Sequence, residues 1–233
     1  MTDSERDDVK HASNQGPNSI RGVALDMDGL LFDTEALYWQ VGDTILQRRG
    51  FRFSKPLQQN MMGRVGVAAM QQMIDFHSLE DSPQDLLTES NELFGNLLTT
   101  ELRPMEGLGE WIDLLQKSGL PFGLATSSQR KFVDVIFEQI TWRESLAFTL
   151  TGDDVTRGKP DPQMYLMAAE KLAIDPVTML VLEDSGNGCA AAVAANAYTV
   201  AVPSEHTREQ SFDGAKLIAD SLLDERLWQL VTG

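Results

Sequence analysis

Two pairs of acidic residues stand where apolar segments of the sequence end. Asp26 and Asp28 follow the run IRGVAL, and Glu183 and Asp184 follow the run TMLVL. Beside a metal ion, one carboxylate of such a pair can attack an electrophile while the other moves a proton. Hard oxygen donors from two strand ends are what Mg²⁺ requires. The spacing therefore predicts a magnesium-dependent centre to which both pairs contribute.

The first pair also allows two simpler interpretations. The segment DMDGLLFD can be an acidic turn in which Asp33 caps the next helix. A calcium loop of the D-x-[DN]-x-[DN]-G type is the second alternative. It is excluded because Leu30 takes the third acidic position and no glutamate closes the loop.

Two further segments carry groups that bind anions. Thr126 and Ser127 follow the run PFGLA and open a helical pattern, where hydroxyls and free backbone N–H groups can hold a phosphate. Lys159 lies in the turn RGKPDP, whose glycine and prolines can aim its ammonium group at a phosphate. Taken alone, each segment also fits an ordinary helix cap or an exposed turn.

Short apolar runs alternate with helical patterns along most of the chain, which indicates how these groups are positioned. Such runs suit strands buried on both faces of a parallel sheet. Alternation with helices predicts an α/β fold with a doubly wound, Rossmann-like sheet, in which ligands bind beyond the carboxyl ends of the strands. The expected strands are 20–25, 121–125, 147–150, 178–182 and 198–202, with 216–219 as a sixth.

The stretch from Thr34 to about Arg103 lacks strand candidates and predicts an all-helical insertion, with helices over 34–49, 65–77 and 83–102. We therefore expect a mobile tail over 1–19, a core domain formed by 20–34 and 104–233, and a cap domain over 35–103. The insertion has no acidic residue between 44 and 74. Its basic residues therefore either form a solvated face or contact an anionic ligand, and we favour the ligand. They are Arg48, Arg49, Arg52, Lys55 (in a loop-like SKP context) and Arg64.

Composition narrows the classes of function. The 233 residues include 35 Asp and Glu against 19 Lys and Arg, a net charge of −16, which argues against nucleic-acid partners and anionic membrane surfaces. The single Cys189 excludes an intrachain disulfide. We find no apolar run of about 18 residues and no secretory signal, and we expect a cytoplasmic protein. The oligomeric state is not readable, and a monomer is the default expectation.

Together and in this order, the motifs resemble those of the haloacid dehalogenase-like (HAD) hydrolase superfamily. The first signature matches Asp26–Thr34, the second Thr126, the third Lys159 in GKPDP, and the fourth Glu183 and Asp184. The insertion resembles the C1 cap of that superfamily. The strings DMDGLLFDTE, GKPDP and LEDSGNG look most like the branch of sugar-phosphate phosphatases and β-phosphoglucomutases.

This resemblance implies roles for the motif residues. Asp26 would attack phosphorus in line and become an aspartyl phosphate, while Asp28 would protonate the leaving alcohol and later deprotonate water. Mg²⁺ would be held by the Asp26 carboxylate, the Asp28 backbone carbonyl and the Asp184 carboxylate, with Glu183 reaching it through a water. The phosphoryl oxygens would be bound by Thr126, the Ser127 N–H and Lys159. The cation and the lysine would offset repulsion between carboxylate and phosphate.

The implied function is a Mg²⁺-dependent phosphatase for a small phosphorylated metabolite such as a sugar phosphate. Dehalogenases resembling this fold lack the second aspartate, because halide departure needs no proton, and Asp28 therefore favours phosphoryl transfer. A phosphosugar mutase is the alternative. Against mutase activity, Tyr38 stands where β-phosphoglucomutases have a histidine. In favour of it, Arg64 matches a cap arginine that binds the second phosphate in mutases.

The third possibility is a catalytically silent regulatory protein on the same fold, against which the intact motif residues count. Substrate identity is expected to depend on the cap, where the candidates are Tyr38, Trp39, Arg52, Met62 and Arg64. The hinges of cap movement are expected near 32–35 and 102–106.

Overall fold

The computed structural model describes residues 19–61, 64 and 66–232, and within them the strands form one six-stranded parallel sheet. The strand order is β3-β2-β1-β4-β5-β6. Each expected strand segment overlaps one of them to within one or two residues at either end, and the Rossmann-like α/β class is confirmed. The strands are β1 (Gly22–Leu25), β2 (Phe122–Ala125), β3 (Leu146–Leu150), β4 (Met179–Glu183), β5 (Tyr198–Ala201) and β6 (Leu217–Ile218).

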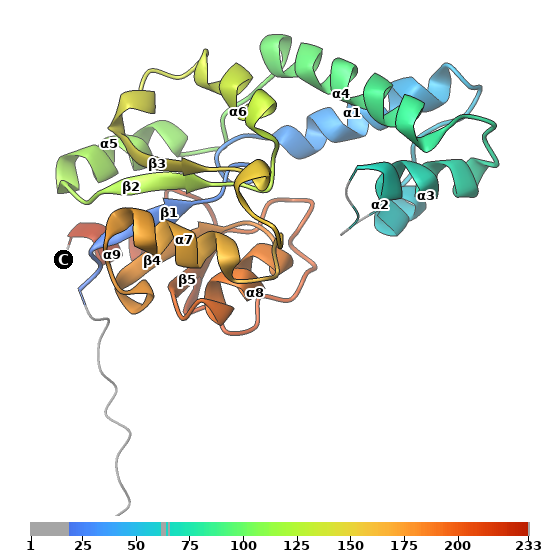
Figure 1. Ribbon diagram of the computed structural model, residues 1–233. Coiled ribbons are helices and arrows are strands. Elements are labelled where there is room, and N and C mark those ends of the chain that lie inside the picture. The colour runs from blue at the N-terminus through green and yellow to red at the C-terminus, as the bar shows by residue number, and fades with distance from the viewer. Residues whose placement is uncertain (1–18, 62–63, 65, 233) are drawn as a thin grey trace, which may run out of the picture.

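Helices cover both faces of the sheet, which is why its central strands are apolar throughout (Figure 1). Val23 and Leu25 of β1 face one apolar cluster, and Ala24 between them faces the other. The first cluster includes α5 (Leu108–Ser118), α6 (Arg130–Phe137) and α9 (Glu225–Thr232), and the second includes α7 (Gln163–Leu172) and α8 (Gly186–Ala194). Three short 3₁₀ turns, η1 (Arg143–Ser145), η2 (Gly152–Asp154) and η3 (Pro176–Thr178), complete the connections.

Four helices lie between β1 and α5 in the described part of the chain: α1 (Thr34–Gln47), α2 (Lys55–Met61), α3 (Val67–His77) and α4 (Pro83–Thr100). We call them the cap. Asp33 caps α1 by accepting from the Ala36 N–H, and Ser82 caps α4. The expected helices correspond to α1, α3 and α4. The loop-like assignment of Lys55 is wrong because α2 begins there; its only buried residue is Leu57, so no apolar period marks it.

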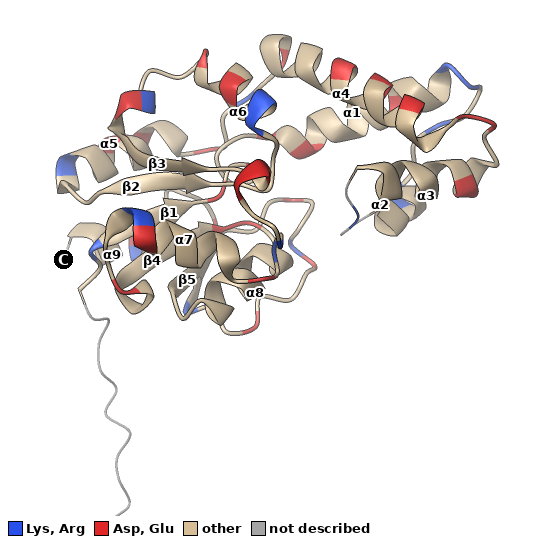
Figure 2. Cartoon of the chain, viewed as in Figure 1, with Lys and Arg blue, Asp and Glu red and all other residues tan. Residues whose placement is uncertain are grey.

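Ion pairs within the cap engage most of the basic residues that the sequence singled out. They are Arg48–Glu89 (2.6 Å), Arg49–Asp81 (2.7 Å), Arg49–Glu89 (2.8 Å) and Arg52–Asp43 (3.0 Å). Figure 2 shows both signs of charge at the outer end of the cap. For these three arginines the structure supports the charged-face interpretation. Our preference for an anionic ligand is corrected, because carboxylates from outside the acid-free stretch pair with them.

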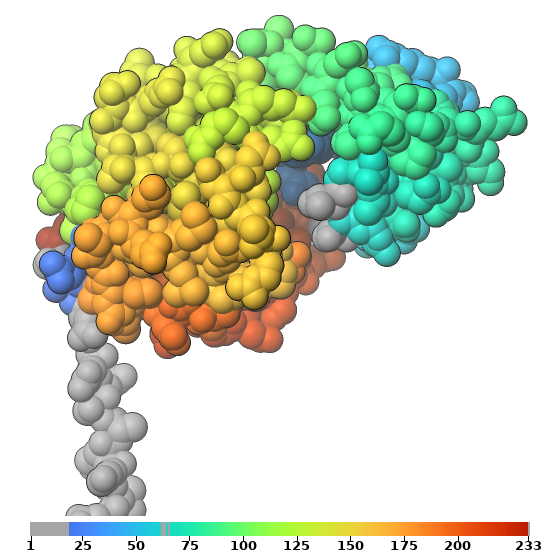
Figure 3. Space-filling view, in the orientation of Figure 1, coloured from blue at the N-terminus to red at the C-terminus, as the bar shows by residue number. Residues whose placement is uncertain are grey.

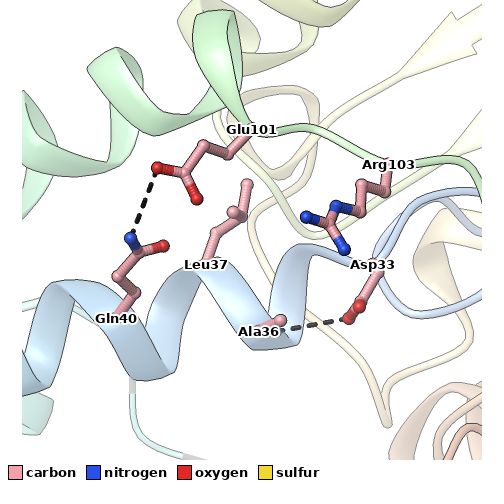
Figure 4. A pocket seen from close by; sticks show the side chains of 6 residues that line it. All are labelled: Asp33, Ala36, Leu37, Gln40, Glu101 and Arg103. Carbon is pink, nitrogen blue, oxygen red and sulfur yellow. Dashed lines mark hydrogen bonds between the residues drawn. The ribbon is translucent and has the colours of Figure 1, made fainter.

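The chain crosses between core and cap twice, and the two crossings run side by side. The Asp33 N–H donates to the Arg103 carbonyl at 3.0 Å, and the Met105 N–H donates to the Leu31 carbonyl at 2.9 Å. Beside them lies a cavity of about 190 Å³ (Figure 4), lined by Asp33, Ala36, Leu37, Gln40, Glu101 and Arg103. The crossings coincide with the expected hinges, and movement about them stays a prediction.

Residues 1–18 of the expected tail lie outside the described residues. Among the helices that the structure describes, none is long and apolar enough to cross a membrane.

Candidate active site

The turn after β1 brings the first acidic pair to the edge of the sheet. The Asp26 N–H continues the ladder to β4 by donating to the Leu182 carbonyl at 3.0 Å. Gly29 then adopts a φ of 77° in the left-handed region, and a Cβ at this position would overlap the carboxylate of Asp184. Glycine is therefore needed here both for the backbone conformation and for the close approach of the second pair.

The structure brings Asp26, Glu183 and Asp184 into one cluster at the ends of the neighbouring strands β1 and β4. One carboxylate oxygen of each lies within 4.8 Å of the others, and the residues are 6 %, 0 % and 3 % exposed. Desolvation raises the pKa of Asp26 to about 8; the charge of Lys159 acts against this rise, and the charges of Glu183 and Asp28 add to it. Desolvation and the charge of Asp26 also raise the pKa of Asp184 well above its usual range.

Lys159 is the cation of this cluster. Its Nζ lies 2.5 Å from Asp26 Oδ1 and 2.6 Å from Glu183 Oε1, and it donates to the Ala125 carbonyl at 2.9 Å. Desolvation alone would lower the pKa of Lys159, but the charges of Asp26 and Glu183 raise it well above its ordinary value. The ammonium group therefore stays charged, and its three donors are all engaged.

Glu183 is held by more than the lysine. The buried Tyr165 hydroxyl donates to Glu183 Oε1 at 2.5 Å, and the Ser185 hydroxyl donates to Oε2 at 3.1 Å. Gly188 leaves the space that this carboxylate fills, since a Cβ there would overlap it. The sequence did not indicate Tyr165, because a buried tyrosine on α7 looks like an ordinary core residue.

Asp28 is surrounded by three hydroxyl donors. Thr34 donates to its Oδ1 at 2.9 Å, while Thr126 and Ser128 donate to its Oδ2 at 2.8 Å each. Thr126, which the sequence assigned to phosphate, is thus bound to Asp28 here, and Ser127 lies exposed beside it. The sequence missed Thr34 and Ser128 as partners of Asp28; the hydroxyls that flank the predicted motif positions were the available signal.

The cap residues that the sequence suggested as substrate contacts differ in their surroundings. Trp39 packs edge-on against Phe53, with 5.0 Å between ring centroids, inside the cap. Arg64 is exposed and donates to the backbone carbonyl of Asn60, so its role in substrate binding stays a prediction. Met62 lies outside the described residues.

The donor set fits a divalent cation. Three carboxylates, those of Asp26, Glu183 and Asp184, converge on an edge where Lys159 is the basic partner within ion-pair distance among the described residues. The raised pKa values of two of them show that the positive charge present does not compensate for the burial of the acids. Carboxylate oxygens are the ligands that Mg²⁺ prefers.

Comparison with known proteins agrees with this geometry. The profile of the haloacid dehalogenase-like hydrolase family matches residues 23–202. The chain therefore belongs to this family, and the recognition of a hydrolase from its motifs is confirmed.

Two relatives and one structure illustrate the similarity. The chain is 34 % identical over 222 residues to (DL)-glycerol-3-phosphatase 2 of Arabidopsis thaliana, covering 91 % of this chain and 92 % of the relative. It is 28 % identical over 194 residues to hexitol phosphatase B of Escherichia coli, covering 80 % and 85 %. A crystal structure of a HAD hydrolase from Entamoeba histolytica shares the fold, with a TM-score of 0.76, 24 % identity and coverage of 92 % and 100 %.

Proposed function

We propose that this protein is a Mg²⁺-dependent phosphatase that hydrolyses a small phosphorylated metabolite, of the sugar-phosphate kind, through an aspartyl phosphate on Asp26. The observation that carries the proposal is the clustering of Asp26 and Asp184 within 4.8 Å, with Lys159 bound to Asp26. The relatives support it, because one is named for glycerol phosphate and another for phosphorylated hexitols.

The residues of the chain supply the covalent chemistry. Asp26 forms a bond to phosphorus as the bond to the leaving alcohol oxygen breaks, and Asp28 gives that oxygen its proton. In the second half, Asp28 accepts a proton from water while the water oxygen attacks phosphorus. The bond between Asp26 and phosphorus then breaks, which releases inorganic phosphate and restores the carboxylate.

The remaining motif residues bind charge. Mg²⁺ would be held by the carboxylates of Asp26 and Asp184 and the Asp28 carbonyl, with Glu183 through a water, and would supply positive charge against the phosphate dianion. Lys159 stabilises phosphoryl oxygens from the side of Asp26, to which it is already bound. The Thr126 hydroxyl and the Ser127 N–H bind further oxygens once a phosphate enters.

The direct test is release of inorganic phosphate from a panel of phosphorylated metabolites, with Mg²⁺ and after chelation. Asp26→Asn should lower turnover by roughly three orders of magnitude or more, and a phosphorylated adduct seen by mass spectrometry after acid quenching should disappear. Asp113→Asn, at an exposed position on α5, is the matched control. Full activity of the Asp26→Asn protein would refute the nucleophile.

The same panel distinguishes the mutase alternative, since a mutase would return an isomer with the phosphate moved. A silent regulatory protein would give neither product. The cytoplasmic location, the absence of nucleic-acid and membrane partners and the monomeric state stay predictions of the sequence.

A further inference from the structure

The first turn of α1 places an additional carboxylate next to the reaction centre. Thr34, the first residue of the helix, donates to Asp28 at 2.9 Å, and Glu35 follows it directly. Glu35 is half-buried. Burial raises the pKa of Glu35, the positive field of His206 lowers it, and the charges of Asp28 and Asp33 raise it further. The residue is therefore one position along the helix from a direct contact with Asp28.

A loop of the core also reaches this edge of the sheet. His206 belongs to the loop after β5, and the next residue, Thr207, is buried and lies within hydrogen-bond distance of Asp184 Oδ2 at 3.4 Å. The first turn of α1, which carries Glu35, and the loop that supports Asp184 thus both lie at the edge that holds the acidic cluster. The chemistry proposed above uses neither Glu35 nor His206.

Tyr38 shows where this face of α1 points. It lies three residues after Glu35, on the same face of the helix, and its ring stacks on Phe94 of α4 with 4.1 Å between centroids. Phe94 in turn meets Phe132 of α6 edge-on at 4.9 Å. Desolvation of its hydroxyl and the charge of Asp28 raise the pKa of Tyr38, yet the residue is 44 % exposed. Because Thr34, four residues before Tyr38, contacts Asp28, this side of α1 borders the reaction edge.

Figure 3 shows a hollow between the core and the cap, with the early, blue part of the chain visible at its base. Within the part of the chain that the structure describes, no Lys, Arg or His nitrogen forms an ion pair with Glu35. Lys159 is already shared by Asp26 and Glu183. An unpaired, half-buried carboxylate accepts hydrogen bonds from hydroxyl donors and repels a second anion.

We propose that Glu35 determines specificity by accepting hydrogen bonds from hydroxyl groups of an uncharged, polyhydroxylated leaving alcohol, and by rejecting monoesters that carry a carboxylate near the phosphate. This inference rests on the proposed phosphatase activity and names its substrate class. Tyr38 forms the apolar side of the same subsite with its exposed ring.

The test compares two probes that differ at one group, glycerol 3-phosphate and 3-phosphoglycerate, with p-nitrophenyl phosphate as a reporter of the chemistry. The wild-type protein should prefer glycerol 3-phosphate by roughly 100-fold in kcat/KM, because like charges repel strongly in a partly buried site. Glu35→Gln should lower kcat/KM for glycerol 3-phosphate roughly 10- to 100-fold, the effect of losing hydrogen bonds to a charged acceptor. The same change should raise kcat/KM for 3-phosphoglycerate.

The control is Glu80→Gln, an exposed glutamate between α3 and α4, which should change neither value. Calorimetric binding of both probes to Asp26→Asn proteins, with and without Glu35→Gln, gives a second readout that needs no turnover. An unchanged preference in Glu35→Gln, or an equal loss for both probes, would overturn this inference while the phosphatase proposal stands. A wild-type protein that hydrolyses none of the three esters would overturn both.

Discussion

Replacing Tyr165 by phenylalanine tests how the buried acid–lysine cluster is held together. The Tyr165 hydroxyl donates to Glu183 Oε1 at 2.5 Å, the same oxygen that Lys159 Nζ approaches at 2.6 Å. Burial and the charge of Glu183 raise the pKa of Tyr165 well above its usual range, so the hydroxyl keeps its proton and remains a donor.

The magnitude follows from what phenylalanine keeps and removes. Lys159 Nζ lies 5.0 Å from the ring centroid of Tyr165, and the ring survives the substitution. The hydrogen bond to a charged acceptor does not, and such bonds contribute about 1.5–3 kcal/mol. The free energy of unfolding should fall by about this amount. For a chain of this length, that change corresponds to a decrease in Tm of roughly 3–12 °C.

The assay is urea unfolding at neutral pH in the presence of a chelator, so that ligand binding does not contribute. Tyr198→Phe is the matched control, because Tyr198 is half-buried on β5 and its hydroxyl makes no hydrogen bond within the described residues. It should stay within about 0.5 kcal/mol of the wild-type protein. If Tyr165→Phe were equally stable, the hydroxyl would not stabilise Glu183 and the reasoning would be refuted.

Two other perturbations probe the backbone and the cap. Gly29→Ala forces a side chain onto the Asp184 carboxylate at a φ of 77°, and should abolish most phosphatase activity. Gly50→Ala is the control, because its φ is 82° but the space around it is open. It should lower the free energy of unfolding by only about 1 kcal/mol and leave the activity unchanged. Equal losses of activity in the two variants would contradict the explanation. Hydrogen bonds from Arg49 lower the pKa of Asp81 below its usual 3.8, so this pair stabilises the fold above about pH 4 and the contribution is lost as the pH falls through the lowered value. Arg49→Met should therefore flatten the decline of stability in acid, and an unchanged acid titration of unfolding would exclude this contribution.

The strands and the acidic cluster could be predicted from the sequence because both depend on local patterns. Buried parallel strands are continuous apolar runs, and an acidic residue directly after such a run lies at the edge of the sheet. Asp26 and Asp184 could therefore be paired before any coordinates existed, since the carboxyl ends of parallel strands share one edge.

The side chains that contact these acids could not be predicted from local sequence patterns. Tyr165 and Glu183 are 18 residues apart, and Ser128 and Asp28 are 100 apart. Partners at such separations are chosen by the packing of whole helices. The same reason explains the cap arginines: Arg49 lies in a stretch free of acids, yet it binds Glu89, 40 residues further along.

The adjacency of the two crossings has a consequence for how such proteins diversify. Because Asp33 and Arg103 are hydrogen-bonded neighbours, the chain leaves the core and returns to it at nearly the same place. The cost of closing such an excursion grows only slowly with its length. Helices can therefore be gained, lost or exchanged between these two positions without altering the register of any strand, so selectivity can be remodelled while the reacting groups stay where they are.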